Sequence, residues 1–397
     1  MKNNKIWNRM YLCAFIANFL HNTAQFTVSP LVAAYAGSLG ATASVIGVIS
    51  GLFYGVAFAV RPFSGPAITK LNKKHIMIAA YAVGILVNGG YALSGSLPVF
   101  VMARFLHGLQ FAFIGSLTLT IASDSLPSEK MGSGLGIFGI NTAVATAIAP
   151  GVGLFLREWG AARFGGNAGY TVVFAFAACC MALSIVPVLL MPYKPLTDKQ
   201  RGEIGVWYKN IAAKEAFIPA LVITFICFAS ILYTFYMESF AREQNIANIG
   251  LFFTVYALVL LCARPLSGRL LDKHGFAAVV YPALALFAAS FVVVGLGKRF
   301  ETCLIGAVLA AIGYGAAQPA LQTMAIQSVD PLRRGVASNT AYFGMDLGYW
   351  LGPTIGGLII SGSSIAALYA AAVVPVAIAA VIFIFGQRAR KKLHLQE

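Results

Sequence analysis

Three ionisable side chains lie deep inside long apolar runs of the sequence, where a charge is costly to bury. Asp346 is the one carboxylate deep in such a run, Arg104 is the one full positive charge, and His21 titrates near neutral pH when unperturbed. Because ionisable residues in such places are functional candidates by default, we expect Asp346 to bind a proton or a cationic substrate. The alternatives are a carboxylate satisfied by a nearby hydroxyl for Asp346, an ion pair or carbonyl contact for Arg104, and a hydrogen-bonded packing residue for His21.

The position of Asp346 within its run places it near the middle of a membrane. The run covers 336–360, and ten residues at about 1.5 Å each put Asp346 roughly 15 Å inside a hydrocarbon core of about 30 Å. Helical spacing puts Asn339, Tyr342 and Tyr349 on the same face as Asp346. A ridge of small residues lies on the other side of this helix and comprises Gly344, Gly348, Gly352 and Gly356. We expect the ridge to pack against a neighbouring helix and the polar face to line a cavity.

Further polar side chains recur at helical spacing in other runs. The first run carries Asn18, His21, Asn22 and Gln25, and four polar groups on one face are costly toward lipid. They therefore face a cavity or a partner helix. His107 lies one turn after Arg104. The remaining candidates for lining a cavity are Tyr233, Tyr236, Tyr314, Gln318, Gln322, Tyr342 and Tyr349, and packing is the alternative for the aromatic ones.

Composition identifies the kind of protein that carries these residues. The chain has 397 residues, of which 59% are hydrophobic and 10% charged, against about 25% charged in ordinary soluble domains. Such a chain belongs in a lipid bilayer, and this location accounts for the net charge of +15 better than a nucleic-acid partner does. The six cysteines lie in apolar runs without metal-ligand spacing. No nucleotide, nucleophile or zinc motif is found, so we expect no catalytic residue, no metal, no cofactor and no enzyme activity.

The apolar runs predict an all-α membrane protein with twelve transmembrane helices in two six-helix repeats. The first six runs cover 10–33, 44–63, 76–95, 98–122, 133–156 and 170–192. The last six cover 217–239, 249–266, 277–297, 302–326, 336–360 and 364–386. We therefore expect an N-terminal six-helix bundle over 1–192, a cytoplasmic linker over 193–216 and a C-terminal six-helix bundle over 217–397.

A tandem duplication explains the two repeats. Residues 264–275 read Arg264-Pro-Leu-Ser-Gly-Arg-Leu-Leu-Asp272-Lys-His-Gly275, and an earlier copy over 61–72 reads Arg61-Pro-Phe-Ser-Gly-Pro-Ala-Ile-Thr69-Lys-Leu-Asn72. The same offset relates further pairs, namely Gly65 and Gly268, Gly132 and Gly335, Pro150 and Pro353, and Gly153 and Gly356. One constant offset over more than a hundred residues indicates that one half arose by copying the other.

The distribution of basic residues predicts the orientation in the membrane. If the N-terminus is cytoplasmic, external loops hold five of the 28 basic residues and Arg104 lies within a run. The five are Arg157, Arg163, Arg242, Lys298 and Arg299. All the others fall on the cytoplasmic side, so we expect both termini, the linker and the duplicated motif to be cytoplasmic.

The two repeats, the basic central loop and the duplicated turn resemble the major facilitator superfamily over essentially the whole chain. Three segments are more specific. Residues 104–108 are similar to the family's Arg-x-x-x-Gly motif, residues 149–153 resemble the Gly-Pro motif of its antiporter branch, and residues 352–357 have the full Gly-Pro-x-x-Gly-Gly form. These antiporter-type positions are Pro150, Gly151, Gly153, Gly352, Pro353, Gly356 and Gly357. The resemblance to the drug–proton antiporter branch implies a substrate site between the halves and a role for Arg104 in proton transfer or anion binding.

The same resemblance implies that the duplicated motif is a cytoplasmic gate. Its residues here are Arg61, Gly65, Thr69, Arg264, Gly268, Asp272 and Gly275. In relatives the aspartate looks like a latch at the N-terminus of a facing helix, where an anion is favoured. Because Thr69 replaces the aspartate in the first copy, we expect the latch at Asp272 to be the stronger one.

These observations predict a secondary active transporter that exports small amphipathic solutes or drugs in exchange for protons. Import or passive passage of a nutrient is the alternative within transport, and a receptor that does not transport is an alternative of another class. We expect a monomer in the bacterial inner membrane, with a small-molecule substrate, protons and the lipid bilayer as its partners.

Overall fold

A computed structural model describes residues 5–204, 206–297 and 299–394. Within these ranges the chain forms α-helices and short 3-10 turns, and no strand occurs. The predicted all-α class is therefore confirmed. Lys2 and Lys298, which contribute to the charge bias, lie outside the described residues.

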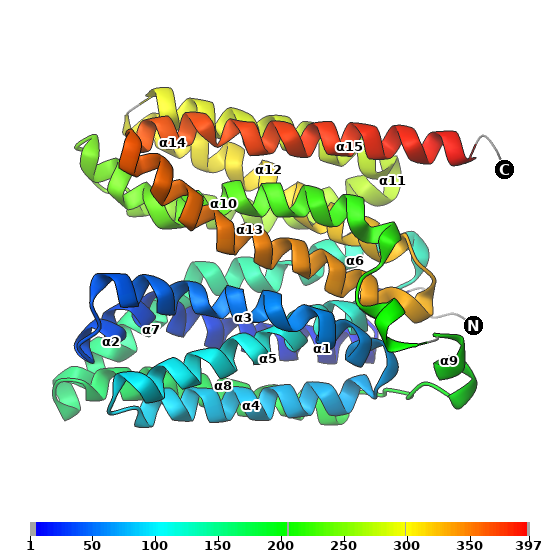
Figure 1. Ribbon diagram of the computed structural model, residues 1–397, viewed down its shortest axis with the longest axis horizontal. Helices are drawn as coiled ribbons and strands as arrows, with labels where there is room; N and C mark the ends of the chain where they lie inside the picture. Colours follow the sequence, from blue (N-terminus) through cyan, green and yellow to red (C-terminus); the bar gives the residue numbers. More distant parts are fainter. Residues whose placement is uncertain (1–4, 205, 298, 395–397) are drawn as a thin grey trace. The chain divides into compact units, whose positions relative to one another are not determined.

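The first six spans follow one another with short connections (Figure 1). They are α1 (Arg9–Val28), which continues through the turn Ser29–Leu31 into α2 (Val32–Ser38), α3 (Ala43–Lys70), α4 (Lys73–Leu93), α5 (Leu97–Asp124), the pair α6 (Met131–Phe138) and α7 (Ile140–Phe164), and α8 (Ala168–Leu190). The fifth span is thus two helices, divided at Gly139 without a proline at the division.

The remaining elements are the linker and the last six spans. The linker holds α9 (Asp198–Glu203) and the turns Trp207–Asn210 and Lys214–Ala216. The spans that follow are α10 (Phe217–Glu243), α11 (Gly250–Gly297), α12 (Phe300–Gln327), α13 (Arg334–Gly362), and α14 (Ile365–Ala371) with α15 (Val373–His394). α11 is two spans joined end to end, because Gly275 breaks it with φ 79° and ψ 178°, a left-handed conformation that suits glycine.

The number of spans agrees with the twelve predicted. Nine helices in the described part of the chain are long and apolar enough to cross a membrane, and α11 is one of these although it holds two spans. α1 and α13 complete the set and are less apolar than the others. They are the two helices on which the sequence places the polar faces around His21 and Asp346.

The chain divides into two compact units that follow the two halves of the sequence except for two short segments. Unit 1 consists of Met1–Pro127, Asn141–Ile211 and Pro331–Asn339, and unit 2 of Ser128–Ile140, Ala212–Asp330 and Thr340–Glu397. α6 thus packs with the C-terminal half, and the start of α13 packs with the N-terminal half. The predicted boundaries did not include this exchange.

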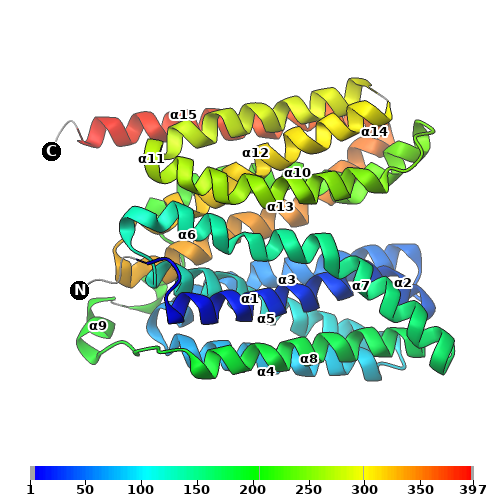
Figure 2. The same ribbon diagram turned by 180° about the vertical axis from the view of Figure 1, so that it is seen from behind.

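In unit 1, α4 packs against α5 and α8, and α3 packs against α5; both views show α4 and α8 side by side (Figure 1, Figure 2). Buried aromatic rings hold these helices together. Tyr35, for example, lies with its ring centroid 5.1 Å from Phe100 and 4.9 Å from Tyr170. These rings are large and pack in preferred geometries, so they fix the spacing of the helices.

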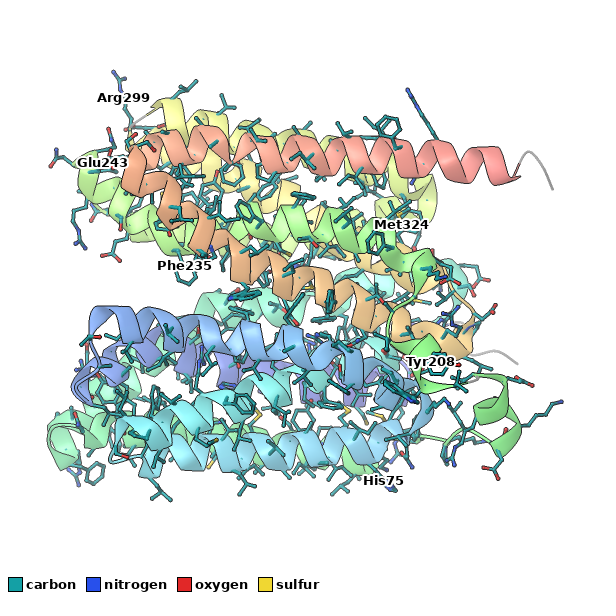
Figure 3. All side chains as sticks on the ribbon, in the orientation of Figure 1. His75, Tyr208, Phe235, Glu243, Arg299 and Met324 are labelled. Carbon is teal, nitrogen blue, oxygen red and sulfur yellow. The ribbon has the colours of Figure 1, made fainter. Side chains whose placement is uncertain are left out.

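In unit 2, α11 packs against α12, α15 and α6, and α10 packs against α12 and α15. Glu243 and Arg299 lie at the same end of this unit, and Met324 lies toward the other end (Figure 3). An aromatic core joins the helices at the Glu243 end. There the Tyr233 ring stacks on Phe291 at 4.5 Å and lies 5.3 Å from Tyr369.

Candidate functional site

Asp346 is the only buried carboxylate among the described residues, with 1% of its surface exposed. It lies in unit 2, where the hydroxyls of Tyr314 and Tyr349 are 2.5 Å apart. The Cys227 thiol of α10 is 3.9 Å from the Tyr314 hydroxyl and within electrostatic range of Asp346. The structure therefore gathers a carboxylate, two phenols and a thiol from α10, α12 and α13.

The polar residues predicted on α12 continue this group. Gln318 accepts a hydrogen bond from the Arg264 guanidinium over 3.1 Å. The Gln322 amide lies 3.2 Å from the Met345 sulfur, next to Asp346 in the sequence. Arg264 is 4% exposed, so unit 2 contains a buried cation as well as the buried carboxylate of Asp346.

The glycine ridge of α13 packs on α10, as its spacing predicts. A Cβ at Gly344 or Gly348 would contact the carbonyl oxygens of Ala220 and Thr224. At Gly356 and Gly357 the space is taken by Tyr236, whose hydroxyl donates to the Pro353 carbonyl over 2.7 Å. The antiporter-type glycines of this helix therefore provide close contact between helices.

Two of the predicted cavity residues have other surroundings. Tyr233 is 4% exposed and donates or accepts a hydrogen bond with Ser290 over 2.9 Å inside the aromatic core. Tyr342 is half-buried on α13. Helical spacing alone does not separate a tyrosine of the core from one near Asp346, because both faces of a buried helix are apolar.

The polar face of α1 lies within unit 1 and has mixed partners. Asn18 accepts a hydrogen bond from Thr118 of α5 over 3.2 Å, and Asn22 donates to Thr142 of α7 over 3.3 Å. His21 is 1% exposed and Gln25 is 8% exposed. The face therefore contacts neighbouring helices, which is one of the two alternatives that the sequence left open.

Arg104 and His107 also lie inside unit 1. The Arg104 guanidinium lies 4.8 Å from the Phe53 ring centroid, and its Nε donates to the Ile49 carbonyl over 3.3 Å. His107 Nδ1 is 3.1 Å from the Tyr91 hydroxyl. Arg104 thus makes the carbonyl contact considered for it, supplemented by a cation–π contact. Gly108 allows a close approach, because a Cβ there would lie 2.7 Å from the Phe53 carbonyl oxygen.

The second copy of the duplicated motif binds both ends of α6. The Asp272 carboxylate accepts hydrogen bonds from the backbone N–H groups of Gly132 and Ser133 over 2.7 and 2.8 Å. Arg264 donates to the carbonyl of Gly139, the residue that ends α6. An anion at the N-terminus and a cation at the C-terminus both match the helix dipole. Between them, Gly132, Gly136 and Gly268 bring the two backbones together.

The first copy of the motif binds the start of α13 instead. Asn339 donates to the Arg61 carbonyl over 2.7 Å and accepts from the Ser64 hydroxyl over 2.8 Å. A Cβ at Gly65 would meet this amide at 2.7 Å. Thr69 lies against the start of α13, since a Cβ at Gly335 would be 2.8 Å from its hydroxyl oxygen. Its hydroxyl donates to the Gly65 carbonyl within its own helix over 2.8 Å and carries no charge, unlike Asp272.

An ion pair lies near the first copy. Lys73 contacts Asp124 at 2.5 Å, and Arg334 lies 3.9 Å from the same carboxylate and donates to the Ser123 carbonyl over 3.0 Å. Asp124 thus supplies a charge that the first copy itself lacks. Asn72, which replaces the glycine of the second copy, caps α4 by accepting from the backbone N–H groups of Lys74 and His75.

The antiporter-type residues of the fifth span have unequal roles. A Cβ at Gly153 would contact the Thr27 carbonyl, so this glycine lets α7 approach α1. Gly151 has open space around it, and Pro150 lies within the continuous helix α7.

Several residues of these networks were not identified as candidates from the sequence. They include Cys227, Ser64 and Gly139, whose partners are distant in the sequence. Asn339 was placed on the face of Asp346 by helical spacing, but its amide belongs to unit 1. The pairing of Arg61 with Arg264 across the duplication was the one signal that pointed to both docking sites.

Comparison with known proteins agrees with this architecture. A family model described as Major Facilitator Superfamily matches residues 14–248 and 237–396. Multidrug resistance protein MdtG of Enterobacter lignolyticus is 26% identical over 387 residues, which cover 91% of this chain and 88% of that protein. The Staphylopine export protein of Staphylococcus aureus is 23% identical over 331 residues, which cover 80% of this chain and 78% of that protein.

Solved structures share the fold. The human organic anion transporter MFSD10 has a TM-score of 0.78 at 15% identity, covering 94% of this chain and 98% of that chain. The transporter FucP, solved in the outward conformation, has a TM-score of 0.77 at 13% identity, covering 96% of this chain and 99% of that chain. At such identities the likeness concerns the fold, which is the predicted arrangement of two six-helix repeats.

Proposed function

The chain belongs to the major facilitator superfamily, and we propose that it exports small amphipathic solutes in exchange for protons. It is an integral membrane transporter and not an enzyme, as its family and its apolar helices establish. The names of its relatives favour export, since they include a multidrug resistance protein and a staphylopine export protein.

The observation that carries the proposal is the burial of Asp346 beside Tyr314, Tyr349 and Cys227. A carboxylate that is 1% exposed in the middle of a membrane-spanning helix is costly when ionised. Protonation of Asp346 or binding of an organic cation each removes that cost. Because the two events compete for one carboxylate, a proton entering at this site displaces a cationic substrate, which is the requirement for exchange.

The aromatic and amide groups near Asp346 fit a substrate with apolar rings and a few polar atoms. Tyr314 and Tyr349 offer hydroxyls and ring faces, and Gln318 and Gln322 offer amides. Ring faces attract organic cations as well as apolar surfaces. This composition supports amphipathic solutes over sugars, which need many hydrogen-bonding groups arranged around one ligand.

The proposed transporter is a monomer in the bacterial inner membrane with both termini in the cytoplasm. The excess of basic residues in the linker and in the loops of the duplicated motif supports this orientation. The site at which Asp272 and Arg264 bind the two ends of α6 is then cytoplasmic. Since α6 continues through Gly139 into α7 of unit 1, a rearrangement of the halves during transport releases α6 from α11 or bends the chain at Gly139.

The proposal is tested with purified protein in liposomes, with ethidium as a fluorescent cationic probe. An inwardly or outwardly directed proton gradient is imposed, and ethidium movement is followed with the wild type and with Asp346→Asn. We expect gradient-driven movement in the wild type, its loss on adding a protonophore, and at least about a tenfold lower rate in the variant, because the amide cannot exchange a proton.

Glu238→Gln serves as a matched control, since it alters an exposed carboxylate that pairs with Arg242 of its own helix, outside the buried group. If ethidium movement in the wild type is independent of the proton gradient, proton antiport is rejected and passive passage is favoured. Coupling that survives intact in Asp346→Asn would instead remove this carboxylate from the mechanism while leaving export in place.

A further inference from the structure

A seam of buried polar side chains runs between α4 and α5 inside unit 1. It comprises Tyr81, Asn88 and Tyr91 on α4, His107 and Gln110 on α5, and His21 at its end on α1. Each of them is at most 1% exposed. The two helices lie side by side in both views (Figure 1, Figure 2). On α4 the spacing of these residues keeps them on one face, which is the face toward α5.

Many polar atoms of this seam have no hydrogen-bond partner among the described residues. They are both ring nitrogens of His21, the hydroxyl of Tyr81, Oδ1 of Asn88, Nε2 of His107, and both Nε2 and Oε1 of Gln110. Elsewhere in proteins the great majority of buried polar atoms are paired. A group of unpaired atoms along one seam therefore requires an explanation that isolated unpaired atoms do not.

The members of the seam are contiguous. Asn88 donates to the Gly84 carbonyl over 2.8 Å, and a Cβ at Gly84 would lie 3.5 Å from Nε2 of Gln110. One turn farther, the Tyr91 hydroxyl is 3.1 Å from His107. In the other direction, the ring centroids of Tyr81 and His21 are 6.2 Å apart. His21 and His107 are within electrostatic range of each other, so the seam joins two imidazoles.

The unpaired atoms include both donors and acceptors. A neutral imidazole has one donor and one acceptor nitrogen, an amide has both, and a phenol has both. Small molecules that accept from one such group and donate to the next are required, and water does both while needing little space. We propose that this seam binds a chain of ordered water molecules that connects His21 with His107.

Cationic side chains lie around the seam. Arg104 of α5 lies within electrostatic range of His107, and the guanidinium of Arg61 on α3 lies 5.9 Å from the Phe111 ring, which stacks beside His21. Tyr81 and Tyr91 of α4 also belong to the seam, and no described carboxylate of unit 1 is buried there. The water chain joins two imidazoles, and an imidazole passes a proton along such a chain by exchanging the donor and acceptor roles of its two nitrogens.

The proposal is tested by the sign of a stability change, measured as the thermal unfolding midpoint of the purified full-length protein in detergent. If the seam is dry, removing an unpaired oxygen with Tyr81→Phe leaves the midpoint unchanged or raises it. If water pairs these atoms, Tyr81→Phe and Gln110→Met each break a hydrogen bond and lower the midpoint by about 2–4 °C. Tyr369→Phe is the matched control, because its hydroxyl is unpaired in the described structure and lies among aromatic rings.

We expect the unfolding midpoints of the two seam variants to fall and the midpoint of Tyr369→Phe to remain within about 1 °C of the wild type. Equal behaviour of all three variants would overturn the proposal. A second measurement uses histidine labelled with ¹⁵N in a variant that keeps His21 and His107 and carries His75→Gln, His274→Gln and His394→Gln. Magnetisation transfer from water to both imidazoles in lipid bilayers is expected, and its absence at both would show a dry seam. Neither measurement depends on a transported substrate, so export could fail its own test while this proposal stands.

Discussion

The second copy of the duplicated motif uses charges where the first copy uses neutral groups. In unit 2, Asp272 and Arg264 bind the two ends of α6. In unit 1, the start of α13 is bound through the amide of Asn339, which contacts Ser64 and the Arg61 carbonyl. Both sites dock a short helical segment from the other half of the sequence. Duplication therefore preserved the docking geometry while the chemistry of the two sites diverged.

The length of α6 explains the spacing of Arg264 and Asp272 in the second copy. α6 has eight residues, which is about 12 Å of helix. Asp272 lies eight positions after Arg264 on the antiparallel α11, so the two side chains reach opposite ends of α6. Each charge near a helix end contributes about 0.3–1 kcal/mol when exposed and up to about 2 kcal/mol when partly buried. In unit 1 the first copy itself contributes neutral hydrogen bonds of about 1 kcal/mol each.

The largest difference between the copies is expected at their shared glycine. A Cβ at Gly268 would lie 2.5 Å from the Gly132 carbonyl oxygen, which is fixed in the backbone of α6. A Cβ at Gly65 meets the amide of Asn339 at 2.7 Å, the end of a side chain that can move. Overpacking against backbone costs about 1–3 kcal/mol. We expect Gly268→Ala to slow ethidium transport by more than about tenfold and Gly65→Ala by less than about threefold, measured in the same liposomes. Equal losses would show that the contact at Gly268 and the contact at Gly65 are equally rigid.

The next difference concerns the acidic position. Asp272→Asn keeps one hydrogen bond but removes the charge at the N-terminus of α6, and we expect docking to weaken by about 1–2 kcal/mol, or roughly 5–30-fold. Thr69→Ala removes only a hydrogen bond within its own helix and should change transport less than about twofold. Besides transport, the readout is the alkylation rate of Ser267→Cys in a variant without native cysteines.

Ser267 is a suitable reporter because it is 6% exposed and lies beside Gly132 of α6. Release of α6 uncovers it, so Asp272→Asn should raise its alkylation rate and Thr69→Ala should not. Similar transport rates for both variants, without any change in alkylation, would contradict the view that the second copy holds the stronger latch.

The sequence predicted what depends on local spacing and on the duplication. Twelve spans and the packing of the Gly344 ridge follow from helical periodicity, which does not need the tertiary fold. The break at Gly139 was not predicted from the sequence, because no proline marks it. The partners of Asn339 lie more than 200 residues away in sequence, and Tyr233 fits a core and a cavity equally well. Spacing on one helix specifies a face, whereas the neighbour of that face is a property of the whole fold.

Asn339→Ala, at the neutral site in unit 1, is expected to have a smaller effect than Gly268→Ala or the upper range for Asp272→Asn. Asn339→Ala removes the amide between Ser64 and the Arg61 carbonyl, which costs about 1 kcal/mol and should slow ethidium transport by about threefold to fivefold. Because Asn339 is 1% exposed and uncharged, this loss should be the same at about 50 mM and 500 mM salt. Asp272 is exposed, so salt screens its attraction to α6 in the wild type. The deficit of Asp272→Asn should therefore shrink at high salt, and a deficit that is independent of salt would mean that Asp272 acts through hydrogen bonds alone.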